Sequence, residues 1–136
     1  MILYDASAFF ELLKEQKLEL DSFLLDLSFY EIGNVIWKHK NILRQISDAD
    51  TKKIVELLCC WQNVIRLEWE KDFRPIVEIT LSENITFYDA SYLHFAKKHS
   101  MQLLTADKKL YKTAVKKKIN CLLIKETTGR SKTNNY

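Results

Sequence analysis

Short apolar runs alternate with amphipathic segments along most of this chain. Five apolar runs have the length of buried strands and lie at 2–5, 22–26, 64–68, 102–105 and 120–124. Segments with helical spacing lie at 6–16, 28–41, 47–62, 75–84, 88–98 and 108–117. Strands that alternate with helices in this way are typical of an α/β fold with a mainly parallel sheet.

A strand that ends near an aspartate and leads directly into a helix occurs twice. The motif is Ile-Leu-Tyr-Asp at 2–5 and Leu-Leu-Thr-Ala-Asp at 103–107. Ligands of parallel α/β sheets bind beyond the carboxyl ends of the strands, so Asp5 and Asp107 should share one edge. Neighbouring carboxylates repel unless one is protonated or a cation bridges them. The repeated motif therefore indicates a metal site.

The composition is that of one globular domain. Hydrophobic residues make up 47% of the 136 residues and charged residues 29%, which suits a folded core. We expect a single domain over 1–126 and a mobile tail over 127–136, because that last segment is polar and aperiodic. No stretch approaches the roughly 20 apolar residues that span a membrane, and no basic region precedes the first apolar run. Three cysteines without C-x-x-C spacing add to the expectation of a cytoplasmic protein with reduced thiols.

The second predicted helix places polar side chains along one face. Glu31, Asn34 and Lys38 are spaced at i, i+3 and i+7, opposite an apolar face. Ser28 and Glu31 also have the spacing of a capping box, which would give this glutamate a purely structural role. A capping box does not account for the alignment of Asn34 behind Glu31.

The other acids leave the same alternative open. Thr86 and Asp89 fit a helix cap, and Asp5 and Asp107 could be ordinary N-caps. Each acid lies near the start of a predicted helix, where backbone N–H groups and the helix dipole favour negative charge. Several helix starts along one sheet edge would together form an acidic pocket.

Four motifs resemble the signature blocks of PIN domains, and the similarity is strongest to VapC-type toxins of prokaryotic toxin–antitoxin pairs. The blocks are Y-D-A-S at 4–7, F-Y-E-I-G-N at 29–34, T-F-Y-D-A-S-Y at 86–92 and L-L-T-A-D at 103–107. Their order and spacing agree over about residues 2–124. The resemblance implies a three-layer α/β/α sandwich around a central, mainly parallel twisted sheet.

The resemblance also implies site residues and an activity. The four catalytic acids would be Asp5, Glu31, Asp89 and Asp107. Mg²⁺ or Mn²⁺ would be bound by Asp5, Asp89 and Asp107. The polar residues that support the acids would be Ser7, Asn34 and Thr105. The expected function is a metal-dependent endoribonuclease that hydrolyses RNA.

Partners follow from the same resemblance. A VapC-type toxin would bind a VapB-type antitoxin and form a homodimer. Trp37, Trp61 and Trp69 are candidate interface residues, although burial in the core explains Trp37 and Trp61 equally well. The competing function is a non-catalytic PIN-like binding or scaffold module in an RNA-processing assembly.

The chemistry expected of these residues is specific. Carboxylates without clustered histidine or cysteine select hard, oxygen-binding cations. One or two such ions would polarise the scissile phosphate, supply hydroxide and stabilise the leaving oxygen, giving 5′-phosphate and 3′-hydroxyl products. Phosphatases of the haloacid dehalogenase type need a second acid where this chain has Ser7.

Lysines are concentrated near the last predicted helix. Lys116, Lys117 and Lys118 form a run, and Lys108, Lys109 and Lys112 precede it. Some of these side chains could line an RNA-binding rim around the acids. A solvated helix face is the simpler explanation, and a net charge of +3 does not decide between the two.

Overall fold

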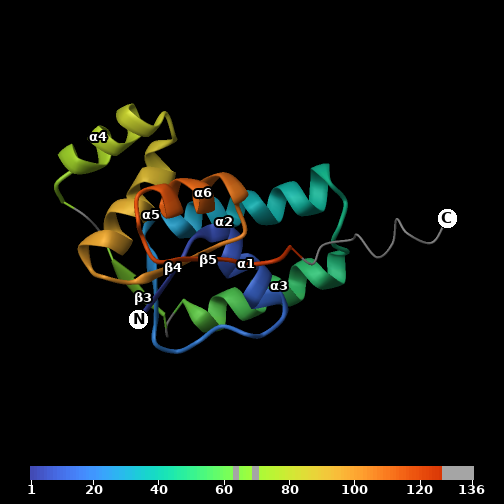
Figure 1. The fold of residues 1–136 in the computed structure, drawn as a ribbon. Helices are drawn as coiled ribbons and strands as arrows, with labels where there is room; N and C mark the ends of the chain where they lie inside the picture. Colours follow the sequence, from blue (N-terminus) through green and yellow to red (C-terminus); the bar gives the residue numbers. More distant parts are fainter. Residues whose placement is uncertain (63–64, 69–70, 127–136) are drawn as a thin grey trace.

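The computed structural model describes residues 1–62, 65–68 and 71–126, and it contains one central sheet (Figure 1). Five strands of the described residues pair in parallel in the order β3-β2-β1-β4-β5. The strands are β1 (Ile2–Tyr4), β2 (Ser22–Leu25), β3 (Arg66–Glu68), β4 (Gln102–Thr105) and β5 (Cys121–Leu123). The prediction of an α/β fold with a parallel sheet is confirmed.

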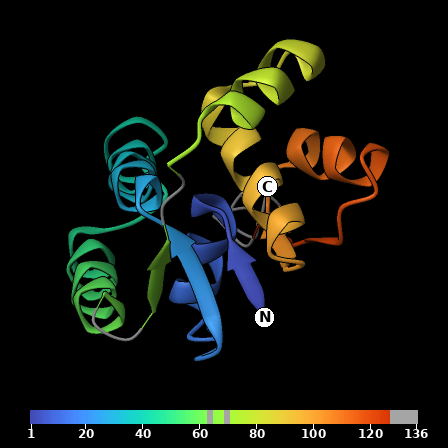
Figure 2. The same ribbon diagram turned by 90° about the vertical axis from the view of Figure 1, so that its left-hand side faces the viewer.

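Helices cover both faces of this sheet, which gives the three-layer sandwich. The helices are α1 (Ala6–Lys14), α2 (Leu27–Trp37), α3 (Asp48–Trp61), α4 (Arg74–Glu83), α5 (Phe87–Lys98) and α6 (Lys108–Lys116). Figure 2 shows the blue strands between the teal and green helices on one side and the yellow and orange helices on the other. Between successive strands the chain returns through helices to the end of the sheet where the next strand begins, as parallel pairing requires.

Alternate residues along the strands point into two separate cores. Leu3 and Leu103 pack under α5 and α6, together with side chains such as Leu93. Tyr4 and Leu104 point to the opposite face and pack under α1, α2 and α3. Both faces of the central strands are therefore buried, which explains why their sequences are continuously apolar rather than alternating.

The strand register brings the two aspartate motifs together. Leu3 pairs with Leu103 and Tyr4 with Leu104, so β1 and β4 end side by side. The backbone N–H of Asp5 donates to the carbonyl oxygen of Leu104 at 3.0 Å. The residues that follow these two strands therefore lie at one edge of the sheet, as the repeated motif predicts.

The segment predicted as one helix over 28–41 differs from the expectation. The α-helix begins at Leu27 and ends at Trp37, and a π-helical turn, η1 (Lys38–Ile42), follows it. Its N-cap is Asp26, whose side chain accepts a hydrogen bond from the N–H of Leu27. The predicted capping box at Ser28 is therefore wrong, because Ser28 lies inside the helix.

Other boundaries shift by one or two residues, and parts of the prediction lie outside the described residues. Those parts are residues 63–64, 69–70, which include Trp69, and the tail at 127–136. Trp61 packs against the core, whereas the side chain of Trp37 is 54% exposed, so core burial is wrong for Trp37. No helix in the described ranges has the length and apolar character needed to cross a membrane.

Candidate active site

Asp5 is the most deeply buried of the four predicted acids. It caps α1, and only 5% of its surface is exposed. One carboxylate oxygen, Oδ1, accepts hydrogen bonds from the N–H of Ala8 at 2.8 Å and the hydroxyl of Ser7 at 2.7 Å. The other oxygen, Oδ2, accepts from the hydroxyl of Thr105. The first and fourth sequence blocks thus meet at one carboxylate.

Ser7 and Thr105 tie the end of β1 to the end of β4. The N–H of Ala106, which follows β4, donates to Ser7 Oγ in α1 at 2.9 Å. The N–H of Asp107 donates to Thr105 Oγ1 at 3.0 Å. Thr105 is fully buried, so its hydroxyl needs both partners. These hydrogen bonds hold Asp5 and Asp107 on adjacent strand ends.

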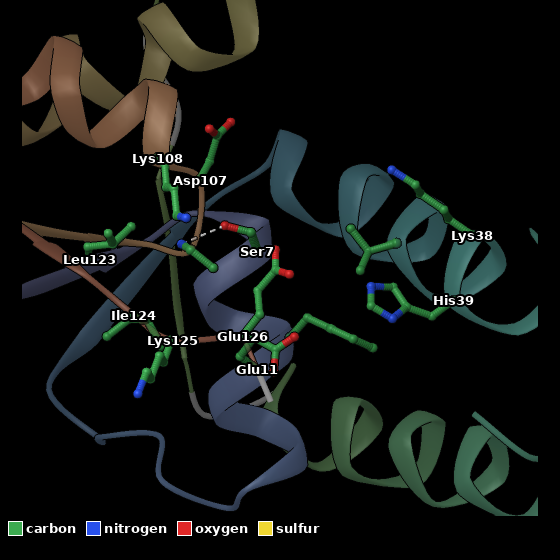
Figure 3. A pocket seen from close by; sticks show the side chains of 13 residues that line it. Ser7, Glu11, Lys38, His39, Asp107, Lys108, Leu123, Ile124, Lys125 and Glu126 are labelled. Atoms are coloured by element: carbon green, nitrogen blue, oxygen red, sulfur yellow. Dashed lines mark hydrogen bonds between the residues drawn. The ribbon is translucent and has the colours of Figure 1, made fainter. Parts of the chain in front are cut away.

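Asp107 is less enclosed than Asp5. It caps α6, with Oδ1 accepting from the N–H of Lys109 at 2.8 Å and of Leu110 at 3.4 Å. Asp107 and Ser7 both line one cavity (Figure 3). The N-cap role that the sequence left open is therefore real at both Asp5 and Asp107, and it does not exclude a second role.

Asp89 enters the same region from α5. Thr86 caps this helix by accepting a hydrogen bond from the N–H of Asp89 at 3.1 Å. Burial raises the pKa of the Asp89 carboxyl, and the negative charge of Asp107 raises it further. The two carboxylates are therefore close enough to repel each other, although 17 residues of chain separate them.

Glu31 is held by a residue to which the sequence assigned no role. The hydroxyl of Tyr92 donates to Glu31 Oε1 at 2.8 Å and lies 2.7 Å from the hydroxyl of Ser28. Burial, followed by the charge of Glu31, raises the pKa of Tyr92 well above 10, so the phenol stays a neutral donor. Tyr92 follows Asp89 at i+3, and this helical spacing was the signal that could have identified it.

For three of the four acids, the charge of a neighbouring acid contributes to a raised pKa. Burial raises the pKa of Asp5 to about 6, even though its three hydrogen bonds act to lower it. The charge of Glu31 contributes to that rise. Burial likewise raises the pKa of Glu31, and the charge of Asp89 adds to the effect. Because Asp89 is in turn affected by Asp107, the structure brings all four acids into one electrostatic cluster.

Asn34 lies apart from this cluster. Its side chain is exposed and lines a shallow hollow with Glu31 and Lys38, so the three residues do share one face. Among the described residues, no hydrogen bond joins Asn34 to any of the four acids. Its support of the carboxylates stays a prediction, whereas Ser7 and Thr105 contact Asp5 directly.

The cluster offers a metal ion only oxygen ligands. Across residues 1–62, 65–68 and 71–126, no three acidic, histidine or cysteine side chains are already arranged to hold one ion together. Burial, and then the charge of a neighbouring acid, raises the pKa of Asp5, Glu31 and Asp89, so their ionised forms are unfavourable here without a cation. A divalent cation that prefers oxygen would supply that compensation, so the residues fit Mg²⁺ or Mn²⁺.

Comparison with known proteins gives consistent matches. The family model described as "PIN domain" matches residues 2–116. "Ribonuclease VapC3" of Pyrobaculum aerophilum is 31% identical over 88 residues, which cover 63% of this chain and 66% of that protein. "Exonuclease VapC9" of the same organism is 27% identical over 87 residues, which cover 64% of this chain and 62% of that protein. Each match spans slightly less than two thirds of the relative's length.

Solved structures agree with the fold. PAE2754 from Pyrobaculum aerophilum superposes with a TM-score of 0.67 at 25% identity, covering 82% of this chain and 84% of that one. FitAcB from Neisseria gonorrhoeae gives a TM-score of 0.54 at 18% identity, covering 90% and 96%. The second likeness concerns the fold alone.

Proposed function

Because this chain belongs to the PIN domain family, we propose that it is a metal-dependent endoribonuclease and the toxin of a VapBC-type pair. The observation that carries the proposal is the cluster of Asp5, Glu31, Asp89 and Asp107. These acids come from four separate parts of the sequence. Burial, with a smaller contribution from the charge of a neighbouring acid, raises the pKa of Asp5, Glu31 and Asp89. Structural N-caps alone would give no reason for four carboxylates to gather at one edge.

We propose that Asp5, Asp89 and Asp107 bind Mg²⁺ or Mn²⁺. A bound divalent ion would polarise the scissile phosphate and make an attacking water more acidic. Ser7 and Thr105 fix the orientation of the Asp5 carboxylate through their hydroxyls, which is how outer residues commonly hold a metal ligand. Binding would require the other carboxylates to turn toward Asp5, since no three ligands converge among the described residues.

Glu31 is proposed to orient the attacking water and take up its proton. Tyr92 donates to Oε1, which leaves Oε2 to accept a hydrogen bond from the water. The raised pKa of Glu31 suits this role, because a base works best when its pKa approaches the operating pH. Attack by water, rather than by the RNA 2′-hydroxyl, gives a 5′-phosphate and a 3′-hydroxyl at the cut.

RNA as the substrate and a protein antitoxin as the partner are also proposals. The names of the two curated relatives support VapC character, and one of them supports ribonuclease action. The other relative is named an exonuclease, so the mode of cutting needs its own test. Homodimer formation and a cytoplasmic location complete the proposal for a toxin of this type.

A specific observation favours a second candidate, a binding or scaffold module without catalysis. The described residues contain no preassembled group of three metal ligands. A domain of this kind would bind RNA or protein partners through the same face and would not need a divalent ion.

Cleavage of a circular single-stranded RNA with Mg²⁺ or Mn²⁺ separates these possibilities. An endonuclease opens the circle, an exonuclease acts only on linear RNA, and a scaffold acts on neither. Asp89→Asn should abolish cutting, whereas Asp48→Asn provides the matched control. Asp48 also lies in the first turn of a helix, but its side chain is 96% exposed on α3. Equal rates for both variants would contradict the proposed site.

A further inference from the structure

A large cavity adjoins the acid cluster on the side of Asp107. Its volume is about 710 Å³, and it opens between α1, the α2–η1 junction and the segments that follow β4 and β5. Ser7 and Asp107 line it, so the cavity lies directly beside the acid cluster (Figure 3). Ligand pockets of about 300–1,000 Å³ accept small molecules, and this volume is ample for one nucleotide.

Three lysines from distant parts of the chain surround the cavity. Lys38 belongs to η1, Lys108 begins α6 and Lys125 follows β5, and Figure 3 shows them on three sides. Within the described ranges, none of the three forms an ion pair. Glu126 also lines the cavity beside these lysines. Three ammonium groups that surround one concave surface and form no ion pair with the described residues attract phosphate groups.

The lysine run near the C-terminus behaves differently. Lys116 and Lys117 contact the carboxylate of Glu83 on α4, at 2.9 and 3.4 Å. Their charges are therefore partly neutralised away from the acids. The run that is most conspicuous in the sequence is thus not the one that faces the candidate site.

The walls of the cavity combine apolar and polar groups. Val35 and Leu123 provide apolar surface, and the ring of His39 packs on the buried Phe10 with centroids 4.7 Å apart. Glu11 also lines the cavity, but Lys14 pairs with its carboxylate at 3.1 Å. Apolar and aromatic side chains beside three lysines suit a nucleotide, whose base is flat and apolar on its faces and whose phosphate is negative.

We propose that this cavity is a nucleotide subsite next to the scissile bond. It receives one unpaired base of the RNA, while Lys38, Lys108 and Lys125 contact the flanking phosphates. The proposal rests on the nuclease function, since it assigns to this cavity the RNA segment beside the cut. It implies a preference for single-stranded RNA, because a paired base cannot enter.

The first test compares two triple variants with equal loss of charge. One is Lys38→Gln/Lys108→Gln/Lys125→Gln, and the control is Lys53→Gln/Lys116→Gln/Lys117→Gln. Binding of a labelled 12-nucleotide RNA is measured by fluorescence anisotropy in EDTA, which prevents cleavage, over a range of salt concentrations. The cavity variant should bind about tenfold more weakly, and its salt slope should fall by about 2, as three lost phosphate contacts predict. Equal affinity and slope in the two variants would overturn the proposal.

The second test replaces one base at a time by an abasic site. Wild-type affinity should fall about tenfold at one position adjacent to the cut, which is the effect of losing one stacked base. Leu123→Ala should reduce that positional effect. An equal loss of affinity at every position would contradict a pocket for one base.

The two proposals can fail separately. Cleavage of RNA by the wild type, with the two triple variants binding alike, leaves the nuclease intact and removes the subsite. Weaker binding by the cavity variant, without cleavage under either metal, supports the subsite and contradicts the nuclease.

Discussion

The two strand–aspartate–helix units, β1–α1 and β4–α6, share a sequence pattern but give their aspartates different surroundings. Asp5 and Asp107 both cap the helix that follows. Asp5 is buried and accepts from two hydroxyls and one backbone N–H, whereas Asp107 is half-buried and accepts from two backbone N–H groups. The local motif therefore determines that each aspartate caps its helix. Contacts with the neighbouring strand determine how far its carboxylate is buried.

The reason lies in the position of the strands. β1 is the central strand, and Thr105 at the end of β4 covers the Asp5 carboxylate from one side. Asp107 lies two residues further along its own unit and faces the cavity. We therefore expect the Asp5 side chain to stay fixed when a metal ion binds, and the Asp107 side chain to change its conformation.

Loss of activity should be the largest difference between the two units. Asp5→Asn should lower kcat/KM for RNA by about 10³-fold, because a metal ligand is worth several kcal/mol in the transition state. Asp107→Asn should cost less, since its carboxylate can be replaced by water. Single-turnover cleavage of one RNA by both variants measures this, and a larger loss in Asp107→Asn would reverse the assignment.

Stability should depend on pH through Asp5. The folded-state pKa of about 6 exceeds the ordinary value of 3.8, so this group's contribution is fully present below about pH 4. It is lost as the pH rises through 6, and the loss amounts to about 3 kcal/mol in metal-free protein. Burial shifts the pKa values of Glu31 and Asp89 in the same direction.

Urea unfolding in EDTA at pH 4.5 and 7.5 measures this dependence as the difference between wild type and Asp5→Asn. Asp5→Asn should show little of the fall in the free energy of unfolding between pH 4.5 and 7.5, whereas Asp107→Asn should show the same fall as wild type. A wild type that becomes more stable relative to Asp5→Asn as the pH rises would contradict the buried, unpaired carboxyl.

The hydroxyl that joins the two units should matter for folding. Thr105→Val leaves Asp5 Oδ2 and the N–H of Asp107 without their partner, at a cost of about 2 kcal/mol in the free energy of unfolding. Thr113→Val is the matched control, because that hydroxyl bonds only to the carbonyl of Lys109 in its own helix. Equal destabilisation of the two variants in urea would show that the link between the units contributes little.

The smallest effect expected concerns Glu31. Tyr92→Phe removes the donor to Oε1 and should lower kcat by about tenfold, as loss of an outer hydrogen bond at a metal site does. The apparent pKa of the base in the kcat profile should rise, because that hydrogen bond lowers the pKa of Glu31. An unchanged pH profile would indicate that Tyr92 is only a core residue.

Much of the fold and part of the site could be predicted from the sequence. The alternation of apolar runs and helical segments was sufficient for the sheet, and the position of Asp5 and Asp107 followed from parallel pairing. The capping box at Ser28 was wrong because its hydroxyl is used by Tyr92, a residue 64 positions away. Spacing within one helix cannot reveal a partner on another.

The surroundings of the site depended on such long-range contacts. The prediction from the sequence did not include Tyr92 as the residue that holds Glu31. In the lysine run at 116–118, Lys116 and Lys117 pair with Glu83 on α4. Lys38, Lys108 and Lys125 meet only because η1, α6 and the end of β5 converge around one cavity. The sequence indicated Ser7 and Thr105, which contact Asp5, and Lys108, which lines the cavity, but it did not place Tyr92, Lys38 or Lys125 in these positions.

The most direct measurement is Mn²⁺ binding by isothermal titration calorimetry, in the absence of RNA, for wild type, Asp5→Asn and Asp48→Asn. Wild type and Asp48→Asn should bind the ion with equal affinity, and Asp5→Asn should bind at least about tenfold more weakly, because it loses a charged ligand. Equal binding by all three proteins, or none by the wild type, would contradict a metal site built on this acidic cluster.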